Sequence, residues 1–69
     1  MSYEVTAITS PSNMFSVGIK NTQKEATALA EMHYKNTRYG KDPIAWTGGP
    51  NMTLYSQQLD GIRYCVQQV

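Results

Sequence analysis

The side chains that could carry out chemistry are few. His33 is the only histidine and Cys65 the only cysteine, so any general base, metal ligand or thiol nucleophile depends on these two. One histidine and one cysteine cannot supply the ligand set of a zinc site. Cys65 falls in the middle of a predicted strand, with no helix N-terminus to lower its pKa. We therefore interpret His33 as a packing residue near a helix C-terminus and Cys65 as a small apolar side chain.

The acidic residues do not leave a catalytic pair either. They are Glu4, Glu25, Glu31, Asp42 and Asp60. Glu25 matches a helix-cap position, Glu31 lies on a helix surface and Asp60 belongs to a turn, so no close pair remains for acid–base hydrolysis. The glycines at 48–49 lack the GK[ST] ending of a phosphate loop. We predict no catalytic residue, no metal ligand and no cofactor, and a protein that is not an enzyme.

The segment from Lys35 to Lys41 is the strongest candidate for contacting a partner. It reads Lys-Asn-Thr-Arg-Tyr-Gly-Lys, with three cations interleaved with a tyrosine and an amide. This composition suits phosphate contacts, stacking on a base or docking on an acidic protein surface. An ordinary helix exit also carries Lys and Arg, so the pattern has a purely structural explanation as well. The predicted partner-binding residues are Lys35, Arg38, Tyr39, Lys41 and, on a sheet face, Arg63.

Length and composition limit the class of protein. The 69 residues form one domain, 1–69, and a chain of this length buries roughly 60% of its unfolded surface. The formal net charge is +1, which indicates neither nucleic acid nor a membrane surface. A lone cysteine fits a reducing compartment. The first residues resemble no signal peptide, and no stretch approaches the ~20 apolar residues of a membrane span. We expect a cytoplasmic protein without membrane contact.

Hydrophobic periodicity and turn residues predict six elements. Alternation indicates strands over 3–9 and 15–20, separated by a break at Ser10–Asn13. Thr22 and Glu25 match a capping box, followed by a helix from Gln23 to Lys35. Strands are predicted at 44–47, 52–59 and 62–69, the last two joined by a two-residue turn at Asp60-Gly61.

These elements predict an α+β domain, an antiparallel sheet with one helix packed on one face, in the order β-β-α-β-β-β. Spacing along the helix places Ala26, Leu29, Ala30 and His33 on the side facing the sheet, against Phe15, Val17 and Ile19. The Asp-Gly turn predicts the pairs Leu59–Ile62, Gln57–Tyr64 and Tyr55–Val66 in the last hairpin. One helix leaves the far face of the sheet partly open.

The stretch from Phe15 to Tyr34, a strand running into a capped helix of pattern EAxxLAExxY, resembles short phage-encoded inhibitors of bacterial RNA polymerase. The whole order of elements, ending in an Asp-Gly hairpin, resembles small anti-CRISPR proteins that act on type I surveillance complexes. Both resemblances imply a non-enzymatic protein that occupies a surface of a bacterial machine. Neither transfers any functional residue to this chain.

The leading functional hypothesis is therefore a small phage or mobile-element inhibitor, anti-CRISPR-like, that occludes a surface of a host nucleic-acid-handling complex in the bacterial cytoplasm. Its partner would be a host protein or ribonucleoprotein, with at most weak nucleic-acid contact. Two alternatives stay open. One is a small nucleic-acid-binding module using the 35–41 segment and an open sheet face. The other is a structural or assembly protein that completes its core by oligomerising, for instance as a homodimer.

Overall fold

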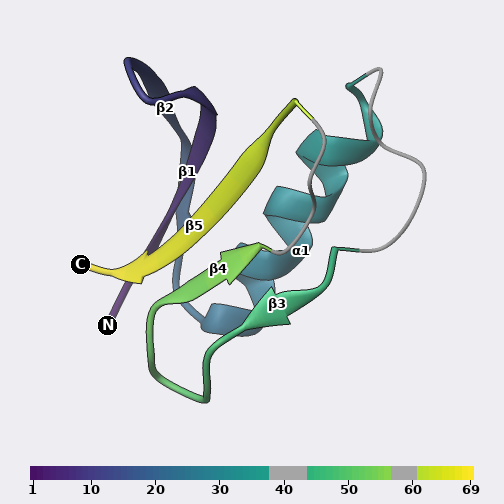
Figure 1. The fold of residues 1–69 in the computed structure, drawn as a ribbon. Coiled ribbons are helices and arrows are strands. Elements are labelled where there is room, and N and C mark those ends of the chain that lie inside the picture. The colour runs from purple at the N-terminus through teal and green to yellow at the C-terminus, as the bar shows by residue number, and fades with distance from the viewer. Residues whose placement is uncertain (38–43, 57–60) are drawn as a thin grey trace.

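One helix packs against one face of a five-stranded antiparallel sheet in the computed structural model, which describes residues 1–37, 44–56 and 61–69 (Figure 1). The α+β class is thereby confirmed. The elements are β1 (Tyr3–Ser10), β2 (Asn13–Lys20), α1 (Gln23–Lys35), β3 (Trp46–Thr47), β4 (Leu54–Ser56) and β5 (Arg63–Gln68). The predicted order is matched in outline, although β3 begins later than predicted and so does β4.

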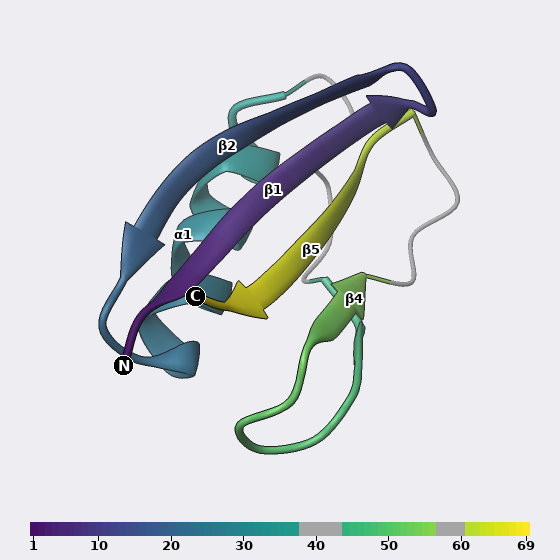
Figure 2. The same ribbon diagram turned by 90° about the vertical axis from the view of Figure 1, so that its left-hand side faces the viewer.

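The strands lie in the order β2-β1-β5-β4-β3, and all neighbouring strands are antiparallel. Figure 2 looks at the sheet from the side opposite α1 and shows β2, β1, β5 and β4 in this order. The C-terminal strand β5 therefore pairs with the N-terminal strand β1 in the middle of the sheet. The two edges are unlike, since β2 has eight residues and β3 only two.

A bulge in β2 overturns part of the predicted helix-facing surface. Val5 pairs with Gly18, but Thr6 pairs with Ser16, so Val17 is an extra residue in β2. The extra residue breaks the alternation of faces. Val17 and Gly18 both face the helix, and Ile19 turns to the other side, opposite Glu4.

The predicted trio of Phe15, Val17 and Ile19 is therefore wrong as a buried set. Ile19 is 56% exposed on the far face, and Phe15, on the helix side but at the sheet edge, is 43% exposed. Only Val17 packs against the core. The helix meets β2 instead through Leu29 and Gly18, where an added Cβ would lie 2.9 Å from the Leu29 Cδ2.

The register of the last hairpin also differs from the prediction. Leu54 pairs with Val66 and Tyr55 with Cys65, so the predicted Tyr55–Val66 pair is wrong by one residue. A one-residue shift moves every side chain of a strand to the other face. Burial of Leu54 and Val66 decides the register. It is reinforced by the Ser56 Oγ, which accepts a hydrogen bond from the Tyr64 N–H at 2.7 Å. The predicted pairs that involve residues 57 and 59 lie outside the described residues.

The helix begins and ends where the sequence predicts. The Thr22 Oγ1 accepts a hydrogen bond from the Glu25 N–H at 3.1 Å, and the Thr22 hydroxyl donates to the Glu25 carboxylate at 3.0 Å. Ala26, Ala30 and Tyr34 are the buried residues of α1. Leu29, predicted in the same buried stripe, is only partly buried and packs at its flank.

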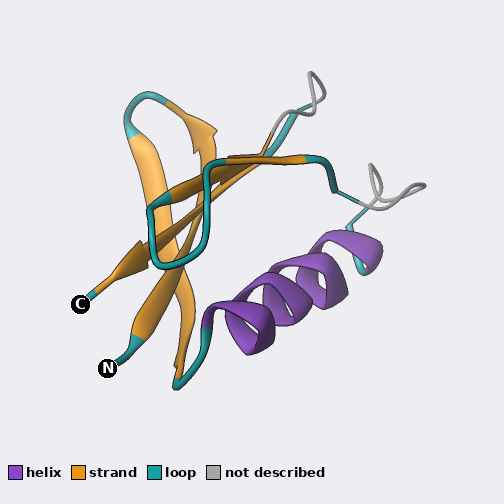
Figure 3. Cartoon of the chain, turned by 90° about the horizontal axis from the view of Figure 1, so that it is seen from below, coloured by secondary structure: helices purple, strands orange, loops and turns teal. Residues whose placement is uncertain are grey.

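The core lies between α1 and the sheet, which form the two layers seen in Figure 3. Small side chains at 26 and 30 let the helix approach the strands. The buried strand residues opposite them are Tyr3, Val5, Ala7, Leu54, Tyr64 and Val66. In the described part of the chain, no helix has the length and apolar character to cross a membrane.

The turn between β3 and β4 is tied to the start of the helix and to β1. The Gln23 side-chain amide donates to the carbonyl oxygens of Gly49 at 3.1 Å and Met52 at 2.9 Å. The Tyr3 hydroxyl donates to the Asn51 side-chain oxygen at 3.1 Å. These bonds hold the short β3–β4 arm of the sheet over the N-terminal part of α1.

Candidate interaction surface

The side of the sheet opposite α1, here called the open face, is an accessible surface of the described structure. No described element covers it (Figure 2). The strand registers show which residues of β2, β1, β5 and β4 lie on the open face. They are Glu4, Thr6, Ile8, Met14, Ser16, Ile19, Tyr55, Arg63, Cys65 and Gln67.

Several large side chains on the open face are accessible to a partner. Met14 is 60% exposed, Ile19 56% and Tyr55 56%. Met and Tyr are enriched in the cores of protein interfaces, as is Arg, which the face carries at Arg63. The side chains stand on a hydrogen-bonded sheet, so a partner would meet a pre-formed surface at low entropic cost.

A pocket of about 390 Å³ opens at one end of the sheet, between the β1–β2 turn and the start of β5. Ile8, Pro11, Ile62 and Arg63 are among its lining residues. Thr9 and Ser10 also line it, so the pocket combines apolar walls with hydroxyl groups and one guanidinium. Such a mixture suits an anchoring side chain of a partner.

The structure locates two of the five predicted partner-binding residues. Lys35 is the last residue of α1, Arg63 is the first of β5, and both are exposed. Figure 1 shows that these two element ends lie at the same end of the molecule. Arg38, Tyr39 and Lys41 lie outside the described residues. Arg63 therefore lies on the open face and also at the end of the molecule where α1 ends and the 35–41 segment begins.

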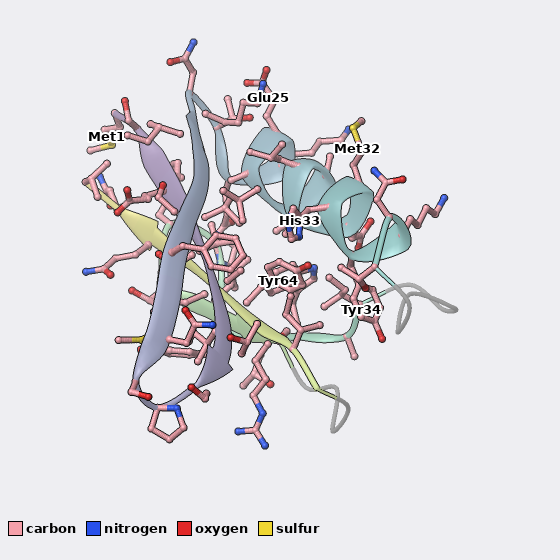
Figure 4. The ribbon with its side chains drawn as sticks, turned by 90° about the horizontal axis from the view of Figure 1, so that it is seen from above. Met1, Glu25, Met32, His33, Tyr34 and Tyr64 are labelled. Atoms are coloured by element: carbon pink, nitrogen blue, oxygen red, sulfur yellow. The ribbon has the colours of Figure 1, made fainter. Side chains whose placement is uncertain are left out.

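His33 and Tyr64 form a close polar pair between helix and sheet. The His33 Nδ1 lies 2.6 Å from the Tyr64 hydroxyl oxygen, and Figure 4 shows His33 directed from α1 toward Tyr64. Edge-on aromatic contacts surround the pair, with ring centroids 5.9 Å apart for Phe15 and His33 and 6.1 Å apart for Tyr34 and Tyr64. Tyr64 is 1% exposed, so this arrangement packs the helix on the sheet.

Cys65 is half-buried in the middle of the open face, paired with Thr6 on one side and Tyr55 on the other. Burial raises the pKa of its thiol, so the thiol stays protonated at neutral pH and is a poor nucleophile. Among residues 1–37, 44–56 and 61–69, no three His, Cys, Asp or Glu side chains gather in a way that could hold a metal ion.

Sequence reasoning does not single out Met14, and it assigns Ile19 to the core because alternation gives no sign of the bulge at Val17. It leaves open whether Tyr55 faces outward, and the predicted register of the last hairpin is off by one. One signal was available for the bulge, because a glycine inside a strand, here Gly18, often marks one.

Comparison with known proteins does not assign the chain to a family. No protein-family model matches the chain, and neither a curated protein nor a solved structure matches it. The functional argument therefore depends on the surface described above.

Proposed function

We propose that this chain is a non-enzymatic binding protein that occludes a surface of a larger complex, with the open face as its contact surface. The observation that carries the proposal is the set of exposed Met14, Ile19 and Tyr55 on a sheet face that no described element covers. A domain this small buries little beyond its own core, so we take a surface, and not an enclosed cavity, as its working part.

The target follows from the resemblance in the strand–helix segment and in the order of elements. We propose a phage or mobile-element inhibitor that acts in the bacterial cytoplasm on a host nucleic-acid-handling complex, in the manner of anti-CRISPR proteins. The near-neutral net charge of +1 supports a protein surface as the contact, because a module that binds nucleic acid through bulk charge is strongly basic.

Affinity capture from bacterial lysate tests the contact surface. We expect the wild-type chain to retain a large complex and the double variant Tyr55→Ala, Arg63→Ala to lose it, because Tyr and Arg are frequent energetic anchors. Met52→Ala is the matched control, since Met52 is 61% exposed on the β3–β4 turn and away from the open face. Retention by the double variant would contradict the open face as the contact surface. In that case the variant Arg38→Ala, Tyr39→Ala tests the 35–41 segment.

Two activity assays test the target class. Expression of the chain should restore transformation by a target plasmid in cells with an active type I surveillance complex. The alternative target is bacterial RNA polymerase, whose transcription in vitro the purified chain would then inhibit. If neither assay responds while a complex is still captured, the chain is a binding protein with a different target.

A second candidate function is a small nucleic-acid-binding module, and one observation favours it. Tyr55, which pairs with Cys65, and Arg63, two residues before Cys65, share the open face, and an exposed aromatic ring and a guanidinium on one sheet face suit stacking on single-stranded bases.

A further inference from the structure

The edge of the sheet at β2 is long and has little of the usual protection against pairing with another strand. β2 is the outermost strand, so about half of its backbone N–H and C=O groups point away from β1 without a sheet partner. Edges are commonly protected by proline, by inward-pointing charges, by β-bulges or by being very short. β3, the other edge, has two residues, whereas β2 has eight, contains no proline and carries its only charge at its last residue, Lys20. Its one protecting feature is the bulge at Val17, which leaves regular stretches on either side, at 13–16 and 18–20.

A strip of exposed helix residues runs beside this edge. Glu25, Ala28, Met32 and Lys35 are spaced at i, i+3, i+7 and i+10, so they lie on one side of α1. All four are exposed, and Met32 is 63% exposed. Lys20 at the end of β2 lines one pocket with the first three of them, so strip and strand end share a side of the molecule. Figure 4 shows Glu25 and Met32 pointing to the same side of α1, away from His33 and Tyr64.

The strip complements itself when it is turned end for end. It is acidic at its start, basic at its end, and has a small and a large apolar residue between them. In an antiparallel arrangement Glu25 faces the partner's Lys35, and Ala28 faces the partner's Met32. The same turn brings Lys20 near the partner's Asn13, so the two strand charges stay apart. Like charges directly opposite one another would be destabilising.

From this complementarity we propose that a second copy of this chain docks on the β2 side of the molecule by two-fold symmetry. β2 pairs antiparallel with the partner's β2, which joins five strands from each copy into one sheet. The two α1 helices then lie antiparallel on the same face of that sheet. Such an interface uses the same surface on both copies and closes on itself, so it forms a dimer and not a fibre.

The dimer sets the exposed apolar side chains that flank the edge beside those of the partner on both sides of the sheet, and the outer surface of those on the open face stays accessible. Phe15 and Met32 are on the helix side, and Met14 and Ile19 are on the open face. Tyr55 and Arg63, on β4 and β5, stay away from the two-fold axis. The dimer therefore presents the part of the open face around Tyr55 and Arg63 twice, on one continuous sheet. The dimer proposal does not depend on the proposed inhibitor function.

Sedimentation equilibrium over a range of protein concentrations tests the proposal. We expect the wild-type chain to have about twice the monomer mass of 7.7 kDa. Met32→Glu should raise the dimer dissociation constant by about tenfold or more, because it buries a charge at the helix contact. Met52→Glu is the matched control, a methionine of nearly equal exposure on the β3–β4 turn, and should leave the dissociation constant unchanged. A monomer mass at every concentration up to about 1 mM overturns the proposal.

Charge exchange tests the antiparallel orientation. Lys35→Glu should weaken the dimer, because it faces the partner's Glu25, and adding Glu25→Lys in the same chain should restore it. Circular dichroism checks that α1 persists, since Glu25 also belongs to the helix cap. A dimer that is insensitive to Lys35→Glu, Met32→Glu and Ile19→Lys alike uses a different surface and overturns the proposal. Capture of a host complex by the Tyr55 and Arg63 variants is scored separately, so the two proposals can fail independently.

Discussion

The buried Tyr64 hydroxyl explains why His33 lies where it does. The Tyr64 ring is almost fully buried, and a buried hydroxyl without a partner costs about 1–3 kcal/mol. The His33 Nδ1, 2.6 Å away, removes that cost. The only histidine of the chain is therefore accounted for by the packing of helix on sheet, and no catalytic role is needed to explain its position.

Removing the Tyr64 hydroxyl should measure this contact. We expect Tyr64→Phe to lower the free energy of unfolding by about 1 kcal/mol, the typical net value of one hydrogen bond. A double-mutant cycle with His33→Ala should give a coupling energy of about 0.5–1.5 kcal/mol by urea denaturation. Tyr55→Phe, on a ring that is 56% exposed, is the control and should change stability little. A coupling energy near zero would show that the two groups do not interact in solution.

A contact between two residues can be predicted from the sequence when they are close along the chain. The capping bond between Thr22 and Glu25 was predictable, because a helix start is governed by residues three apart. The partner of His33 was not, because Tyr64 lies 31 residues further along the chain and its position depends on the whole sheet. The same holds for Gln23, which bonds the carbonyls of Gly49 and Met52.

At the scale of elements, the existence of the strands was easier to predict than the faces they present. Phe15, Val17 and Ile19 alternate in the sequence as one face, but the extra residue in β2 sends Ile19 to the other side. An Asp-Gly dipeptide favours a two-residue hairpin, yet the pairing of Leu54 with Val66 is displaced by one residue from that turn. In both cases the tertiary burial of apolar side chains outweighs a local pattern.

The β3–β4 turn offers a prediction at this scale. Gly48 has φ 135°, and an added Cβ would lie 2.6 Å from both the Leu54 Cδ2 and the Thr53 carbonyl oxygen. We expect Gly48→Ala to lower the free energy of unfolding by about 1–3 kcal/mol, because backbone strain and a backbone clash add together. Thermal or urea denaturation measures the change.

Gly49→Ala is the matched control for that substitution. Its Cβ would lie 3.3 Å from the sulfur of Met52, the end of an exposed and adaptable side chain. The expected change is within about 0.5 kcal/mol. Equal losses in the two variants would show that the turn is not strained at Gly48 in particular.

At the scale of the whole molecule, size explains the open face. A single helix of 13 residues covers one side of the sheet, and the described elements leave the other side uncovered. The sequence predicted that one face would stay partly open, because it contains one helix only. It did not predict that Met14, Ile19 and Tyr55 would lie there, since their placement depends on the bulge and on the hairpin register.

The same surface distinguishes protein occlusion from nucleic-acid binding. Arg63 and Tyr55 could contact a single strand, but a net charge of +1 and the single cation that the described strands place on the open face neutralise few phosphates. Each phosphate contact contributes about −0.7 to the slope of log affinity against log salt for single strands. We therefore expect the isolated chain to bind a single-stranded oligonucleotide weakly at physiological salt, with a small salt slope.

Fluorescence anisotropy over a salt series measures both quantities. If nucleic acid binds the open face, Arg63→Ala should reduce the magnitude of the slope by about 0.7, the contribution of one phosphate. Tyr55→Ala should weaken binding by the loss of one stacked base, about 1–3 kcal/mol. Lys24→Ala, an exposed cation on α1, is the control and should change neither quantity. Nanomolar affinity that depends on both Tyr55 and Arg63 would make nucleic acid the ligand of the open face, because charge this sparse cannot give such affinity without specific stacking and phosphate contacts.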